Sequence, residues 1–192
     1  MPRSFYSDAV MHFLAQSNDE ILGILSSNNS FYLTDLQRNT WQEEIKILKS
    51  AISEFKDGWI VFEHTIPRMG RRIDTVIILR GIIFLLEFKV GSSSYDRHAI
   101  NQVVDYALDL KNFHSKSAKV LLVPTLVATK GQDMTPSPGL IKDGIFNPLL
   151  CNSNNIKAAI DFVLGKEKAE YFEPCDWINA SYAPTPTIIE AA

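Results

Sequence analysis

The chain has 192 residues, of which 46% are hydrophobic and 21% charged, a composition typical of one soluble globular domain with a sizeable core. Its net charge of −3 excludes a protein that is basic overall, so a nucleic-acid site would have to be a local patch. Cys151 and Cys175 lie far apart without a Cys/His cluster, the first residues lack the apolar core of a signal peptide, and no apolar run is long enough for a membrane span. We therefore expect a cytoplasmic protein without a zinc site, disulfide framework or membrane segment.

The first part of the chain is predicted to be helical. Residues 7–26 indicate two short helices broken around Ser17–Asn18. A capping-box pattern, with Thr34 as N-cap and Gln37 three residues later, opens a helix over about 35–55. Apolar residues recur in this helix at steps of three and four: Trp41, Ile45, Leu48 and Ile52.

Three extended segments follow. Residues 59–66 and 73–79 are predicted strands joined by the basic turn 67–72, and a third strand spans 82–90. Only Arg80–Gly81 separates the second and third strands, which favours a tight β-hairpin.

The rest of the chain adds a crossover. A glycine/serine loop leads into a predicted helix over 97–113, followed by a nearly continuous apolar run, 119–129, of the kind found in strands covered on both faces. A surface loop over 131–144, a short strand near 145–150 and a helix over 155–165 are expected next.

The order helix, three strands, helix, strand predicts an α/β fold around a mixed sheet. We expect three parts: a small helical N-terminal extension over 1–33, a core over 34–165, and a C-terminal extension or linker over 166–192.

Two charges, Glu87 and Lys89, lie inside the third predicted strand and point to the same side of it. If Arg80–Gly81 is the whole loop, paired residue numbers sum to 161, and Asp74 lies opposite Glu87 with its side chain on the same face. These residues could form a structural salt-bridge cluster. Alternatively, the two carboxylates hold a divalent metal, and Lys89 stabilises charge that develops on a phosphoryl group.

Asp74, a twelve-residue gap and then Glu87-Phe88-Lys89 resemble the signature of the PD-(D/E)XK nuclease superfamily. Gln102 and Tyr106, four residues apart on the helix after the third strand, match the Q-x-x-x-Y motif of its RecB-like branch. The resemblance implies a restriction-endonuclease-like core with the order αβββαβ. The proline that often precedes the aspartate is replaced here by Ile73.

The family also uses a glutamate on its first helix as a further acid of the metal site. Glu43 and Glu44 are the candidates, and we favour Glu44 because it borders the apolar stripe, whereas Glu43 is turned further outward. A solvated helix face is the alternative for both.

Basic residues near these motifs are candidate contacts to a polyphosphate backbone, although such residues taken alone more often belong to a solvated loop. They are Arg68, Arg71, Arg72 and Arg97.

The sequence segments around these motifs resemble a narrower group: the N-terminal nuclease-like region of bacterial proteins that also carry a Schlafen-like P-loop helicase ATPase. The chain has no G-x-x-x-x-G-K-[ST], so it is not the ATPase itself. The ending over 181–192 is typical of an interdomain linker, and a fused or associated ATPase is an expected partner.

These observations predict a Mg²⁺- or Mn²⁺-dependent deoxyribonuclease. Asp74, Glu87, the Phe88 carbonyl and Glu44 would hold the metal, Lys89 would act on the attacking water, and Gln102 with Tyr106 would position Lys89 or the phosphate. The alternatives are a catalytically silent nuclease-fold module that binds nucleic acid or an ATPase partner, and a domain in which Glu87 and Lys89 are only a buried ion pair.

Overall fold

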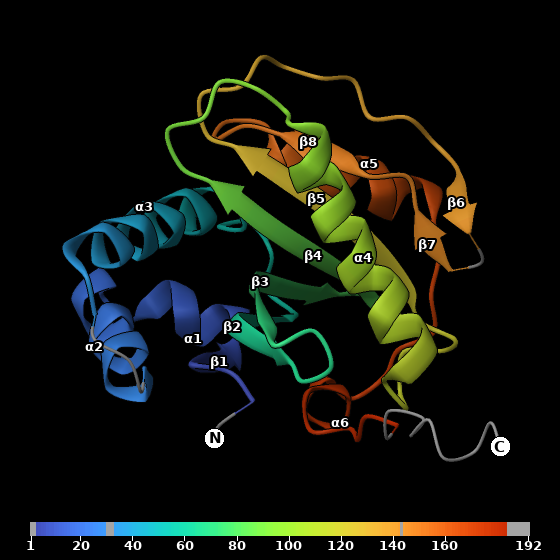
Figure 1. Ribbon diagram of the computed structural model, residues 1–192, viewed down its shortest axis with the longest axis horizontal. Helices are drawn as coiled ribbons and strands as arrows, with labels where there is room; N and C mark the ends of the chain where they lie inside the picture. The colour runs from blue at the N-terminus through green and yellow to red at the C-terminus, as the bar shows by residue number, and fades with distance from the viewer. Residues whose placement is uncertain (1–2, 30–32, 143, 184–192) are drawn as a thin grey trace, which may run out of the picture.

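The computed structural model describes residues 3–29, 33–142 and 144–183, and an open mixed sheet of eight strands with six helices forms this part of the chain (Figure 1). The α/β class and the mixed sheet predicted from the sequence are confirmed. Residues 184–192, the last part of the expected C-terminal extension or linker, lie outside the described residues. No helix in the described ranges combines the length and apolarity needed to cross a bilayer.

Four strands form the antiparallel part of the sheet, in which each strand pairs with the next: β1 (Tyr6–Ala9), β2 (Trp59–Ile66), β3 (Arg71–Leu79) and β4 (Ile82–Lys89). Helix α4 (Arg97–Phe113) then crosses over, and β5 (Leu121–Ala128) runs parallel to β4. The predicted crossover is therefore present.

The remaining strands complete the edge beyond β5. Both β7 (Ile145–Phe146) and β8 (Leu149–Cys151) pair in parallel with β5, and β6 (Leu140–Lys142) pairs antiparallel with β7. The other helices are α1 (Val10–Ala15), α2 (Asn18–Asn28), α3 (Asp35–Ala51), α5 (Ile156–Lys166) and α6 (Pro174–Ile178).

Two hydrophobic clusters cover the two faces of the sheet. The first joins apolar residues of α1, α2, α3 and α5 to one face, and the second joins α4 and α6 to the other. Alternate residues of the central strands supply the two clusters: in β4, Phe84 belongs to the first and Leu85 to the second. Because both faces are covered, β4 is buried along nearly its whole length.

Both chain extensions belong to these clusters. The N-terminal segment supplies the edge strand β1 and buried Phe13, and α6 buries Trp177, whose indole N–H donates to Ser117 Oγ at 2.8 Å. The Arg3 guanidinium also donates to the Ala180 carbonyl. Residues near the two ends of the described chain are thus packed into the same fold as the central part.

Several elements differ from the sequence predictions. Residues 6–9 form a strand instead of a helix start, because they pair with β2. Helix α3 ends at Ala51, where Ile52 leaves helical geometry (ψ 11°), and the expected surface loop contains β6. Thr34 caps α3 by accepting from the Gln37 N–H, as half of the expected capping box.

Candidate functional site

The hairpin β3–β4 has the register expected from a two-residue loop. Leu79 pairs with Ile82, and the ladder continues to Thr75 and Leu86, one step short of Asp74 and Glu87. Beyond it, Asp74 Oδ2 accepts the Phe88 backbone N–H at 2.7 Å. The side chain of Asp74 is therefore fixed at the end of the strand pair that carries Glu87.

Glu87 is the centre of a hydrogen-bond network on the α4 side of the sheet. Its Oε1 accepts from Lys89 Nζ at 2.7 Å and from Gln102 Nε2 at 2.8 Å, and Gln102 Nε2 also donates to the Tyr106 hydroxyl at 2.6 Å. Gln102 and Tyr106 thus reach the sheet as expected, but the contact of Gln102 is with the Glu87 carboxylate and not with Lys89.

The other oxygen of Glu87, Oε2, is buried and has no hydrogen-bond partner among the described residues. The residue as a whole is only 4% exposed. A buried carboxylate oxygen without a donor carries an uncompensated desolvation cost, which a bound cation or water would relieve.

Glu44, the favoured acid of the first helix, is buried in α3 with 2% exposure, and it is close enough to Asp74 and Glu87 for their charges to act on it. Burial raises its pKa well above the ordinary value, and the negative charges of Asp74, Glu63 and Glu87 raise it further. Glu43 is more exposed. The choice of Glu44 as the inward-facing acid therefore agrees with the structure.

A fourth acid, Glu63 of β2, was missed by the sequence motifs. Its neighbours Phe62 and His64 pair with Thr75 and Ile73, so Glu63 lies across from Asp74. Glu63 has φ 54°, a conformation that is uncommon outside glycine. The signal in the sequence was a single charge interrupting an apolar strand, the same kind of signal that singled out Glu87.

Burial raises the pKa values of Asp74 and Glu87, as it does that of Glu44. Burial raises the pKa of Asp74 well above its ordinary value, and the charges of Glu87 and Glu63 add to this against the lowering effect of the Phe88 N–H. Burial also raises the pKa of Glu87, although hydrogen bonds from Lys89, Gln102 and Tyr106 oppose the rise. Added positive charge would stabilise this group of carboxylates.

The four arginines predicted to contact a nucleic acid backbone fall into two groups. Arg68 pairs with Asp109 at 3.4 Å and stacks on the Phe113 ring, and the Arg72 Nε donates to Glu63 at 2.7 Å while its guanidinium stacks on Phe5. Both are held by side chains of the protein itself. Arg71 and Arg97 are exposed and form no ion pair among the described residues.

A pocket of ≈ 740 Å³ adjoins Lys89 and Gln102. Leu36 and Thr40 at the start of α3 line one side, and the loop from β4 to α4 lines the other. The side chain of Lys89 is 37% exposed, so it is accessible from solvent while bonded to Glu87.

The donor set fits a divalent cation in part. Mg²⁺ commonly takes one or two carboxylates and keeps several waters, and Asp74 with the unpartnered Oε2 of Glu87 offers two carboxylates. Within the described ranges, no group of three or more His, Cys, Asp or Glu side chains is arranged to hold a metal. A cation here would therefore depend on two carboxylates, a backbone carbonyl and water.

No protein-family model matches the chain, and searches of curated proteins and of solved structures found no match. A function for this site therefore rests on its geometry and on the sequence motifs.

Proposed function

We propose that the chain is a divalent-metal-dependent nuclease that hydrolyses phosphodiester bonds, with DNA as the favoured substrate. The observation that carries the proposal is the state of Glu87: one oxygen is held by Lys89 and Gln102, and the other is buried without a partner beside Asp74. A restriction-endonuclease-like core is part of the proposal, supported by the element order α3, β2, β3, β4, α4, β5.

Asp74, Glu87 and the Phe88 carbonyl would hold Mg²⁺ or Mn²⁺, with Glu44 completing the site through water or at a second ion. When bound, such an ion polarises a phosphoryl oxygen and increases the acidity of a bound water. Gln102 and Tyr106 fix the orientation of Glu87, so their role would be to position a metal ligand.

Lys89 would orient or deprotonate the attacking water and stabilise negative charge on the phosphoryl group. Its ammonium is held 2.7 Å from Glu87 Oε1 and borders the adjoining pocket, where a phosphodiester could approach. Arg71 and Arg97, which are exposed, would contact the nucleic acid backbone. A fused or associated P-loop ATPase and a cytoplasmic location belong to the same proposal.

A cleavage assay tests the assignment. Wild-type protein is incubated with single- and double-stranded DNA in Mg²⁺, in Mn²⁺ and in EDTA, beside Asp74→Ala, Lys89→Ala and the control Lys116→Ala, an exposed lysine outside the site. We expect metal-dependent cleavage by the wild type and the control and its loss in both site variants. Cleavage that survives both substitutions would contradict the proposal.

A second candidate is a nuclease-fold module that binds nucleic acid or a partner ATPase without cutting. It is favoured by the lack, in the described residues, of a metal-binding group of three side chains. This candidate predicts DNA binding in EDTA, measured by fluorescence anisotropy, with no products in the cleavage assay.

A further inference from the structure

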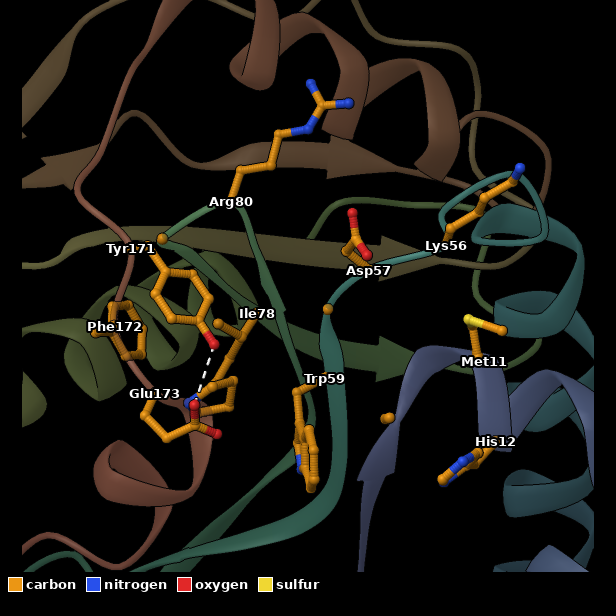
Figure 2. A pocket seen from close by; sticks show the side chains of 14 residues that line it. Met11, His12, Lys56, Asp57, Trp59, Ile78, Arg80, Tyr171, Phe172 and Glu173 are labelled. Atoms are coloured by element: carbon orange, nitrogen blue, oxygen red, sulfur yellow. Dashed lines mark hydrogen bonds between the residues drawn. The ribbon is translucent and has the colours of Figure 1, made fainter.

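A second pocket lies at the opposite end of the β3–β4 hairpin from the acidic site. It has a volume of ≈ 510 Å³ and is formed by the end of β1, the start of β2, the hairpin turn and residues 171–174 (Figure 2). Arg80 lies six residues beyond Asp74, and at a rise of about 3.4 Å per residue the two are roughly 20 Å apart. The pocket is therefore separate from the proposed catalytic site.

One part of this pocket is aromatic. Figure 2 shows the rings of Trp59, Tyr171 and Phe172 grouped around Ile78. The Trp59 indole N–H donates to Ser7 Oγ at 2.8 Å, which fixes the plane of the ring, while Tyr171 is 76% exposed. Exposed and half-buried aromatic rings in a concave site offer stacking surfaces for a planar ligand.

The other part is charged. In Figure 2, Arg80 and Lys56 lie on either side of Asp57, along the side of the pocket away from Trp59. Neither Lys56 nor Arg80 forms an ion pair with any described residue. The same three residues also line a neighbouring hollow of ≈ 250 Å³, so the cavity continues past them.

The backbone at Arg80 provides an independent observation. Arg80 has φ 51° and Gly81 has φ 79°, as the two-residue hairpin turn requires at both positions. Glycine, asparagine or aspartate adopt this conformation at lower cost than arginine does. Arg80 is thus a long cationic side chain at a strained position beside an aromatic pocket, and it forms no ion pair with the described residues. This combination indicates a role in binding.

We propose that this pocket binds a nucleotide unit: a planar heteroaromatic ring stacked on Trp59 and Tyr171, with its phosphate against Arg80 and Lys56. Asp57 would accept hydrogen bonds from a sugar hydroxyl or a ring amino group. Aromatic stacking combined with cations along the backbone path is how proteins hold unpaired nucleotides. The volume is within the range of small-molecule sites. The proposal does not depend on the proposed catalysis.

Binding of adenosine monophosphate to the full chain, measured by calorimetry in EDTA, tests the site separately from nuclease activity. Adenosine lacks the phosphate and ribose 5-phosphate lacks the ring. Each should therefore bind at least about tenfold more weakly than adenosine monophosphate. A short single-stranded oligodeoxyadenylate distinguishes the source of the ligand. Tighter binding of the oligomer assigns the site to a nucleic acid strand, and equal or weaker binding assigns it to a free nucleotide.

Two variants remove the proposed contacts without removing buried side chains. Arg80→Gly removes the guanidinium and relieves the positive φ, so the melting temperature should stay equal or rise while affinity for adenosine monophosphate falls about tenfold. Tyr171→Ala should weaken binding similarly, and the exposed control Lys116→Ala should not. No binding by the wild type, equal affinity for adenosine, or unchanged affinity in both variants would overturn the proposal.

Discussion

Glu63 accepts the indole N–H of Trp41 at 2.9 Å and thereby ties β2 to α3, one helical turn before Glu44. Its second oxygen accepts Arg72 Nε at 2.7 Å, two residues before Asp74 in β3. One partly buried carboxylate therefore links the two elements that carry Glu44 and Asp74. The positive φ of Glu63 is consistent with a backbone held in place by these contacts.

Replacing Glu63 by glutamine should destabilise the fold. Glutamine offers one acceptor oxygen and an amide that donates, so either Trp41 or Arg72 loses its acceptor, and Arg72 loses its counter-ion. We expect the free energy of unfolding in urea to fall by about 1–3 kcal/mol. The control Glu43→Gln, on the more exposed side of α3, should change it little, and equal losses in both variants would contradict the role of Glu63.

Replacing Glu44 by glutamine should stabilise the protein at neutral pH. Burial and neighbouring acids raise the folded-state pKa of Glu44, so its contribution to stability is complete below the unfolded pKa and is lost as pH rises through the folded pKa. A side chain that cannot ionise avoids this loss. We expect a gain of about 1–3 kcal/mol in urea unfolding at pH 8 and a smaller gain at pH 5.

The same Glu44→Gln variant should bind Mn²⁺ more weakly, since it removes a carboxylate from the proposed site. Higher stability together with weaker metal binding in this variant would indicate that Glu44 serves function at a cost in stability. If Glu44→Gln is instead less stable at pH 8 than the wild type, the repulsion among these acids is not a dominant effect.

Replacing Gln102 by leucine should weaken metal binding through Glu87. The hydrogen bond from Gln102 lowers the pKa of Glu87, so its loss raises that pKa and leaves the carboxylate less firmly oriented. We expect Mn²⁺ affinity at pH 7, measured by calorimetry, to fall by about tenfold, and binding to begin at higher pH. Tyr106→Phe removes only a hydroxyl and should have a smaller effect. If Gln102→Leu binds Mn²⁺ with unchanged affinity, Gln102 does not position Glu87 for metal binding.

The parts of the site that sequence predicts best are those fixed by local geometry. The two-residue loop Arg80–Gly81 sets the register of β3 against β4. Counting residue pairs outward from this loop was therefore enough to predict that Asp74 and Glu87 lie close together. The i, i+4 spacing of Gln102 and Tyr106 likewise places both on one face of α4, where the structure has them bonded to each other.

Features set by distant partners could not be predicted in this way. The residues that hold Arg68 and Arg72 lie elsewhere in the chain, so the basic turn gave no sign that two of its arginines are engaged. The register of β2 depends on a longer connection, which hid the position of Glu63 opposite Asp74. Likewise, β1 forms only because β2 offers an edge, and short strands of this kind have little signal of their own.

A buried histidine should make the fold sensitive to acid. His64 is fully buried and stacks on Trp177 at 5.1 Å, and neither ring nitrogen has a hydrogen-bond partner among the described residues. Burial lowers the pKa of His64 to about 3, and it lowers the pKa of nearby His114 to about 4. Both rings are therefore neutral in the folded protein at pH values where they would be protonated in the unfolded chain.

Because these folded-state pKa values are depressed, the stability they support is complete above the unfolded value of 6.5 and is lost as pH falls toward 3–4. Each histidine contributes a slope of up to about 1.4 kcal/mol per pH unit in that window. His64→Phe keeps an aromatic ring against Trp177 and removes one titrating group. Urea unfolding at pH 7, 6 and 5 should show equal or higher stability at pH 7 and a slope smaller by about one proton. An unchanged slope would mean that His64 takes up a proton in the folded state as readily as in the unfolded chain, and that its burial does not keep it neutral.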